Sequence, residues 1–317
     1  MTKSAWVSHF RRDIYSQVKY LRGLRLPNPI STREGLVIGS GDSYTCALLM
    51  EYLSDHRMLA YHPSVILNCP QVLSNHEIFV ISASGRTRSN IEAARMARKI
   101  GLKTTAITAR AKSPLEEVCN ETFNLDYLHK PQLSNTSILE YTATVTFCMA
   151  LIGFDINLNI LGKVMKYARQ QVDHSGIDLP TRFKSIIFLG DGLSYPLANY
   201  GALKMNELFG LGSFGYLLDD YYHAPLFSLK KLDHVFILDY GKVKNSMAGN
   251  FQKKLKKTHA LTYYFRPPSE ISHFENILSS IFVIQIIGLT IAERLKIDKP
   301  YYMSKEKLLK LSSRLIY

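Results

Sequence analysis

Short apolar runs alternate with amphipathic stretches along the whole chain. In the first half the run 36–39 precedes a helix-like stretch near 43–54, and the run 78–82 precedes a strongly amphipathic stretch over 90–100. Gly101 follows at the place expected for a helix C-cap. The pattern also predicts strands near 64–67 and over 104–108, a short helix from Ser113 and a long helix over 135–151. Strands and helices that alternate at this spacing predict a parallel, doubly wound sheet.

The second half repeats this scheme. Residues 39–44 and 190–195 both read G-x-G-x-S-Y, and both follow an apolar run. The two motifs start 151 residues apart, which suits two copies of a whole domain. The predicted elements of the second half are a helix over 160–176, a strand over 185–189, a helix over 194–209, strands near 234–238 and 260–264, and a helix near 275–296.

We therefore expect an α/β protein with two domains, each a doubly wound parallel sheet between layers of helices, an α-β-α sandwich. The predicted parts are a helical segment over 1–30, a first domain over 31–155, a second domain over 156–296 and a tail over 297–317.

Composition is that of a globular protein, with 317 residues, 46% hydrophobic and 21% charged. The net charge is +13, but lysine and arginine are spread along the chain, so we expect no nucleic-acid partner. The four cysteines lack metal-ligand spacing, which indicates reduced thiols in a cytoplasmic protein and no metal site. The apolar stretch 277–292 contains polar residues and predicts a buried helix, so no membrane span or signal peptide is expected.

Glycines and hydroxyl residues gather in two loops of the first half. In residues 39–44 the glycines let the backbone turn sharply and approach a ligand. Residues 82–87 read Ser-Ala-Ser-Gly-Arg-Thr and lie before a helix N-terminus, whose free N–H groups favour an anion. The alternative is an ordinary helix N-cap, where serine and threonine are common. Because the two strands are predicted neighbours, both loops should meet at one sheet edge, and this favours a phosphate site.

Four side chains of the second half are candidates for chemistry. Lys204 and Glu207 are three residues apart and share one face of the predicted helix; the alternative is a surface ion pair. His223 follows two acids in a loop and suits a proton donor, although a lone histidine is more often structural. Lys305, five residues after Pro300, would by itself be an ordinary surface lysine.

Taken together, these motifs resemble the sugar isomerase (SIS) family, and within it the isomerase half of the glutamine–fructose-6-phosphate amidotransferases, the glucosamine-6-phosphate synthases. The likeness covers nearly the whole chain. The family's phosphosugar loop resembles residues 39–44, and its S-x-S-G-x-T loop resembles residues 82–87. Its G-A-L-K-x-x-E helix motif is similar to residues 201–207, its H-x-P loop to residues 223–225, and its lysine-bearing tail to Pro300 and Lys305.

The chain also departs from the family pattern. The family's threonine in the first loop is Asp42, the glutamine of the second loop is Ala83, and its usual acid there is Arg86. The glutamate that begins the helix motif is Tyr200. The residues after Met1 begin no glutaminase domain, so we expect this chain not to release ammonia from glutamine. These changes predict an altered substrate or reaction on the same scaffold.

The resemblance implies a division of roles. The substrate would be a phosphorylated hexose or hexosamine, with no cofactor and with a homodimer as the assembly. His223 would open the sugar ring, Lys305 would form an imine with the keto sugar, Glu207 would move the proton between C1 and C2, and Lys204 would keep Glu207 ionised. The substrate-binding candidates are Ser40, Gly41, Asp42, Ser43, Ser82, Ala83, Ser84 and Thr87.

Three functions remain open at this point. The first is a stand-alone deaminase that interconverts glucosamine-6-phosphate with fructose-6-phosphate and ammonia, of which a deglycase is a variant. The second is a phosphoglucose or phosphomannose isomerase, which needs Glu207 and His223 but no imine on Lys305. The third is a sugar-phosphate-binding regulator without catalysis, which the changes at Asp42 and Ala83 suggest.

Overall fold

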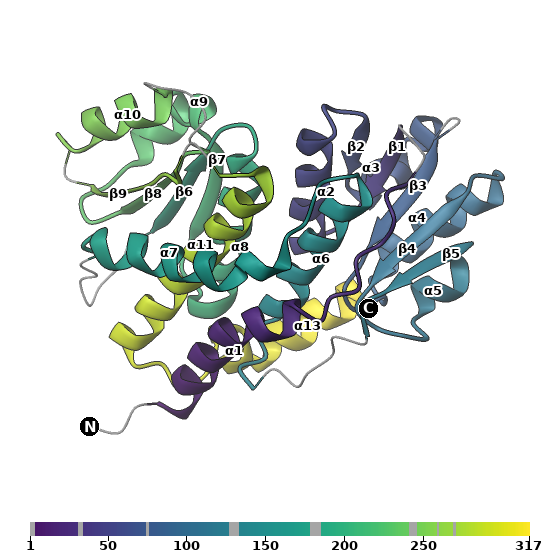
Figure 1. Cartoon of the computed structure of the whole chain (residues 1–317), viewed down its shortest axis with the longest axis horizontal. Helices are drawn as coiled ribbons and strands as arrows, with labels where there is room; N and C mark the ends of the chain where they lie inside the picture. The colour runs from purple at the N-terminus through teal and green to yellow at the C-terminus, as the bar shows by residue number, and fades with distance from the viewer. Residues whose placement is uncertain are drawn as a thin grey trace. The chain divides into compact units, whose positions relative to one another are not determined.

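The computed structural model describes residues 4–30, 34–73, 76–126, 133–177, 185–240, 246–258, 260–268 and 271–317. The chain forms two compact units, each built on its own parallel sheet (Figure 1). The five-stranded unit comprises Lys19–Pro131, Ser137–Ile156 and Glu306–Tyr317, and the four-stranded unit comprises Met1–Val18, Gln132–Thr136 and Asn157–Lys305. The predicted fold class, two doubly wound α/β sheets flanked by helices, is confirmed.

The five-stranded unit has the strand order β2-β1-β3-β4-β5, and every neighbouring pair is parallel. Ile38 lies opposite Val80 in the ladder between β1 and β3, so the loops that leave these strands start side by side. The strands are β1 (Gly35–Ile38), β2 (Met58–Tyr61), β3 (Glu77–Ile81), β4 (Thr104–Thr108) and β5 (Glu121–Asn124). The helices are α2 (Asp42–Leu53), α3 (Pro63–Asn68), α4 (Arg88–Lys99), α5 (Pro114–Val118), α6 (Ile138–Leu151) and α13 (Glu306–Ile316), with a 3-10 turn at Pro70–Leu73.

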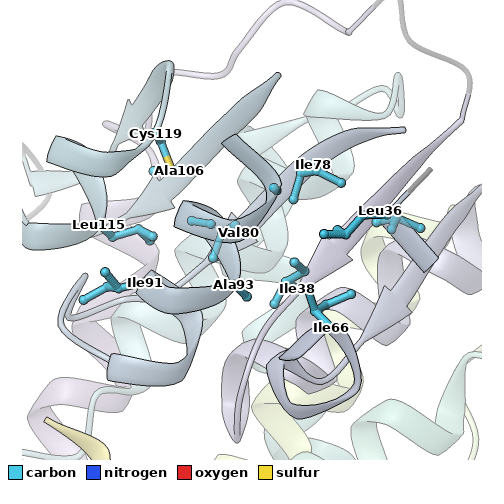
Figure 2. Packing of buried hydrophobic residues seen from close by; sticks show 13 residues of the cluster. Leu36, Ile38, Ile66, Ile78, Val80, Ile91, Ala93, Ala106, Leu115 and Cys119 are labelled. Atoms are coloured by element: carbon cyan, nitrogen blue, oxygen red, sulfur yellow. The ribbon is translucent and has the colours of Figure 1, made fainter. Parts of the chain in front are cut away.

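Alternate strand residues form the core on one face of this sheet. Leu36, Ile38, Ile78 and Val80 face the layer of α3, α4 and α5 (Figure 2). The helices contribute Ile66, Ile91, Ala93, Ala94, Ala97 and Leu115 to the same cluster. Full burial of one such aliphatic side chain stabilises the fold by about 1.5–3 kcal/mol. This packing fixes α4 against the sheet and therefore fixes the loop that joins β3 to α4.

The four-stranded unit has the strand order β7-β6-β8-β9, again with parallel neighbours. Phe188, Phe236 and Tyr263 stack across three strands on one face, with centroid separations of 5.1 and 4.9 Å. The strands are β6 (Ile186–Gly190), β7 (Ser213–Leu217), β8 (His234–Leu238) and β9 (Leu261–Phe265). The helices are α1 (Ala5–Leu21), α7 (Leu161–His174), α8 (Ser194–Phe209), α9 (Leu218–Tyr221), α10 (Met247–Leu255), α11 (His273–Leu295) and α12 (Tyr301–Ser304), with 3-10 turns at Leu158–Ile160 and Ala224–Ser228.

Helix α11 is the central apolar helix of the four-stranded unit. Among the described residues it is the one helix whose length and hydropathy would allow it to cross a membrane, and 83% of its most apolar stretch is buried. The buried helix predicted over 277–292 is therefore confirmed. Even its polar Gln285 is satisfied, since it accepts from Gln17 of α1 at 2.7 Å and donates to the Tyr200 hydroxyl of α8 at 3.2 Å.

One local prediction is wrong, and two edge strands are missed. The strand predicted at 64–67 is helix α3, which begins at Pro63, and the strand lies earlier, at Met58–Tyr61. Proline at the first helical position is favourable because its missing N–H is not needed there. Strands β5 and β7 were not predicted; both lie at a sheet edge.

Candidate functional site

The first glycine loop turns the chain sharply from β1 into α2. A Cβ on Gly39 would lie 2.5 Å from the carbonyl oxygen of Ser43, so any side chain there would clash with the backbone. Gly41 has φ +57°, a left-handed conformation that favours glycine. The turn leaves Asp42 as the first residue of α2, with Ser43 in the first turn. The sequence therefore uses both glycines to bring hydroxyl groups and backbone N–H groups to the end of β1.

The second loop, residues 82–87, follows the neighbouring strand. Ser82 is buried, and its Oγ lies 3.4 Å from the Thr87 Oγ1, while the Ser84 Oγ accepts from the Arg86 N–H at 3.3 Å. Ala83 offers no side-chain donor, and its carbonyl oxygen accepts from the Ala109 N–H at 3.1 Å. The loop thus places three hydroxyl groups before α4.

Helix α4 opens toward this loop without a side-chain cap. Thr87 stands at the N-cap position, but no described side chain caps the first turn of α4. The first N–H groups of a helix have no partner within the helix and carry a partial positive charge. Free N–H groups next to several hydroxyls are suited to bind a phosphate.

A buried asparagine that the sequence analysis missed ties the two loops together. Asn90 of α4 is 1% exposed; its Oδ1 accepts from the Ser40 Oγ at 3.0 Å, and its Nδ2 donates to the Ile81 carbonyl at 3.1 Å. One side chain therefore joins the first loop to the end of β3. The two loops leave neighbouring parallel strands at the same edge of the sheet, as predicted from the strand order.

The second glycine motif repeats the turn with a different residue between the glycines. Gly190 again could not carry a Cβ, which would lie 2.5 Å from the Ser194 carbonyl oxygen. Where the first loop has Ser40, this loop has Asp191, whose Oδ1 accepts from the Leu218 N–H at 3.1 Å. Burial raises the pKa of Asp191, with smaller contributions from the charges of nearby Asp219 and Asp239. The Asp191 carboxylate therefore bonds to the start of α9, while the N–H groups of Ser194 and Tyr195 donate to the backbone carbonyls of Asp191 and Gly192 within the loop.

Lys204 and Glu207 form a close ion pair on α8. The Lys204 Nζ donates to the Glu207 Oε2 at 2.5 Å. The Lys204 side chain is only 5% exposed, whereas that of Glu207 is 31% exposed. The Nζ also lies 5.9 Å from the centre of the Tyr200 ring. The pair is thus not the exposed surface pair considered as the alternative; a buried ammonium faces a carboxylate that water can reach.

The tail that carries Lys305 packs along α8. The Tyr302 hydroxyl donates to the Asn135 carbonyl at 2.8 Å. Burial raises the pKa of Tyr302, the charge of Glu207 raises it further and that of Lys204 lowers it, so the tail lies near the ion pair. Tyr301 packs on Gly210 at the end of α8, and the Lys305 Nζ lies 5.0 Å from the centre of the Tyr301 ring.

His223 lies in the same unit but in a different setting. It is exposed, precedes the 3-10 turn Ala224–Ser228, and its backbone N–H donates to the Asp220 carbonyl at 3.2 Å. The structure thus places Lys204, Glu207, His223 and Lys305 in the four-stranded unit, and the phosphate-binding candidates in the five-stranded unit.

Comparison with known proteins gives the family. A family model described as the SIS domain matches residues 33–153 and 181–265. The chain belongs to the SIS domain family. Each matched segment contains one of the two glycine loops, in agreement with the repeat read from the sequence.

Individual relatives agree with this assignment. Over 303 residues the chain is 24% identical to a glutamine–fructose-6-phosphate aminotransferase of Sulfolobus acidocaldarius, a match covering 85% of the chain and 49% of that protein. Across the matched aminotransferases the chain spans 27% to 53% of their length. The predicted relationship to these enzymes is confirmed.

Solved structures share the fold. A glucosamine-6-phosphate deaminase from Thermotoga maritima has a TM-score of 0.71 and 18% identity, covering 93% of this chain and 97% of that chain. A tagatose-6-phosphate ketose/aldose isomerase from Escherichia coli has a TM-score of 0.68 and 15% identity, covering 95% of this chain and 99% of that chain.

Proposed function

We propose that the five-stranded unit binds the phosphate of a phosphorylated hexose or hexosamine. The observation that carries this proposal is the pair of adjoining loops, which Asn90 joins through the Ser40 Oγ and the Ile81 carbonyl in front of the uncapped α4. Hydroxyl groups and helix N–H groups are the donors that phosphate oxygens need. The residues assigned to this role are Ser40, Gly41, Asp42, Ser43, Ser82, Ala83, Ser84 and Thr87.

We further propose an aldose–ketose isomerase of the amino-sugar type. Glu207 moves a proton between C1 and C2 of the open-chain sugar, and it has both the water access and the neighbouring Lys204 that a working carboxylate base requires. The positive charge of Lys204 favours the ionised form of Glu207 and stabilises negative charge that develops on the sugar. His223 would open the ring.

Lys305 would supply the imine step. Once the proton has moved from C2 to C1, the amino group of the sugar is an imine at C2; the Lys305 amine adds to this carbon and ammonia leaves, and water then hydrolyses the lysine imine to the ketone and the free amine. In the overall reaction, glucosamine-6-phosphate and water give fructose-6-phosphate and ammonia. Packing of the tail on α8 near the ion pair supports this role, as does the shared fold with a protein named as a glucosamine-6-phosphate deaminase.

One observation favours a simple isomerase as the second candidate. Lys305 is exposed and stacks on Tyr301, while the buried lysine among the described residues of this unit is Lys204. An imine-forming lysine is usually desolvated or placed beside another cation. Without the imine, Glu207 and His223 suffice for an aldose–ketose isomerase acting on a hexose phosphate. The changes at Asp42 and Ala83 keep a binding regulator as a third possibility.

Borohydride trapping separates these functions. The chain is incubated with fructose-6-phosphate and borohydride, and adducts are located by intact mass and peptide mapping, with Lys305→Arg as the test variant and Lys299→Arg, in the same exposed tail, as the control. The deaminase proposal predicts an adduct on Lys305 that only Lys305→Arg abolishes.

Two further readouts distinguish the alternatives. Deuterium exchange at C1 or C2 of the bound sugar without an adduct indicates the simple isomerase. Binding without exchange indicates the regulator, and absence of binding overturns the phosphate site itself. A cytoplasmic homodimer belongs to the same proposal, and light scattering of the purified chain tests the dimer.

A further inference from the structure

Tyr317, the residue that follows helix α13, contacts the loop assigned to the phosphate. The Arg86 guanidinium carbon lies 4.7 Å above the centre of the Tyr317 ring, a cation–π distance, and both residues belong to the five-stranded unit. Arg86 directly precedes Thr87, the N-cap residue of α4. A residue 231 positions away in the sequence thus reaches the mouth of the second loop.

Arg86 carries a charge that no described acidic side chain neutralises. Among the described residues no carboxylate lies within ion-pair distance of Arg86, whereas Arg11, Lys103 and Arg169 each have an acidic partner. Arg86 belongs to the loop that carries the three hydroxyls and precedes the open N-terminus of α4, and its exposed guanidinium has the donor geometry that matches phosphate oxygens. A guanidinium can bond an anion with its edge while its face stays on an aromatic ring.

Tyr317 restricts the side chain of Arg86. A free arginine has about 2 kcal/mol of rotamer entropy to lose when it binds a ligand, and a ring that already holds the guanidinium lowers that loss. Helix α13 offers few other attachments, because none of its side chains is buried against the described residues. The contact of the Tyr317 ring with Arg86 is therefore a single attachment at the end of the chain and not part of a buried core.

We propose that Arg86 is a specificity-determining residue for the phosphate and that Tyr317 is its positioning residue. This inference rests on the proposed function. It assigns a role in substrate recognition to the end of α13, and it predicts selectivity for the dianionic phosphomonoester over the neutral sugar.

The test is equilibrium binding by calorimetry of fructose-6-phosphate, inorganic phosphate and fructose. Arg86→Ala is expected to weaken fructose-6-phosphate binding about ten- to hundredfold, the effect of one lost hydrogen bond to a charged group. The control Arg95→Ala removes an exposed arginine of α4 away from the loop and should change the affinity for fructose-6-phosphate less than twofold. Tyr317→Leu should weaken binding about two- to fivefold, the value of an exposed cation–π contact, and Tyr317→Phe should retain wild-type affinity.

Coupling distinguishes positioning from a structural effect. In the Arg86→Ala background, Tyr317→Leu is expected to cause no further loss, and fructose binding should not respond to any of the variants. Unchanged or tighter binding by Tyr317→Leu, or an equal loss in both backgrounds, overturns the inference. If the wild-type chain binds neither fructose-6-phosphate nor inorganic phosphate, the proposed function itself fails.

Discussion

The ion pair on α8 leads to an asymmetric prediction for stability. Lys204 is almost fully buried and Glu207 is about one-third exposed, with 2.5 Å between the Nζ and the Oε2. Removing one partner of a buried pair costs about 3–5 kcal/mol because the remaining charge has lost its counter-charge. We expect this full loss for Glu207→Met, which leaves the buried ammonium. Lys204→Met leaves a carboxylate that water can solvate, so the expected loss is about 1–3 kcal/mol.

The single tryptophan of the chain allows the stability of the four-stranded unit to be measured by fluorescence. Trp6 is the single tryptophan of the chain; it is 7% exposed, and its Nε1 donates to the Ser134 carbonyl at 3.0 Å within the four-stranded unit. Urea unfolding followed by tryptophan fluorescence therefore reports on the unit that contains α8. When the dependence of unfolding free energy on urea concentration is the same for two variants, the difference between their urea midpoints gives the change in the free energy of unfolding.

A surface pair of the same unit serves as the control. Arg169 and Asp173 are 58% and 61% exposed and lie 3.5 Å apart, so Asp173→Asn should change stability by no more than about 0.5 kcal/mol. The double variant of Lys204 and Glu207 should lose less than the sum of the two single losses, because the second change removes the charge that the first left behind. Equal losses for the two single variants, or additive losses, would refute the reasoning.

Three further predictions concern single residues. Gly85→Ala should abolish phosphate binding and destabilise the fold by well over 1 kcal/mol, because φ at Gly85 is +61° and the new Cβ would lie 2.2 Å from the Ser113 hydroxyl oxygen. The control is Gly101→Ala, where φ is +85° but the space is open, so urea unfolding should show only the backbone strain of about 1–2 kcal/mol. Burial raises the pKa of Asp191, so native stability falls as pH rises above about 4, and Asp191→Asn should be stabilising at pH 7 and lose that advantage toward pH 4. Burial raises the pKa of Cys119 to about 11, so at pH 8 only about one Cys119 thiol in a thousand is ionised. Because alkylation requires an accessible thiolate, a mass-spectrometric time course should show half-buried Cys69 alkylated before Cys119.

The sequence predicts the central strands of each sheet better than the edges. Buried strands such as β1 and β3 are continuous apolar runs followed by glycine or serine, which is the pattern of a parallel sheet covered on both faces. The edge strand β5 reads Glu-Thr-Phe-Asn and is at most half-buried, so it lacks this pattern. Edge strand β7 contains Gly215, whose Cβ would lie 2.5 Å from the Asn199 side chain of α8. Packing of α8, and not strand propensity, dictates that residue.

Local motifs predict the positions of the two loops but not the side chains that hold the site together. Asn90 joins two segments that are 50 residues apart along the chain, and a lone asparagine near a helix start is most simply read as a solvent-exposed residue. Tyr302 likewise reaches the Asn135 carbonyl across 167 residues. Such contacts depend on tertiary packing, which no local pattern encodes. A polar residue on the buried face of α4 was the one available signal for Asn90.

The two glycine loops show how far a repeated motif can be trusted. Both turns need glycine for the same steric reason, so G-x-G-x-S-Y correctly predicts the backbone in both units. The residue between the glycines is what differs. Ser40 donates to the Asn90 Oδ1 and so connects the first loop to α4. Asp191 accepts from the Leu218 N–H and so connects the second loop to the start of α9. The N–H groups of Ser43 and Ser194 donate to the carbonyls of Ser40 and Asp191 in the same way, so the repeated motif predicts the backbone but not the tertiary partner of the side chain between the glycines.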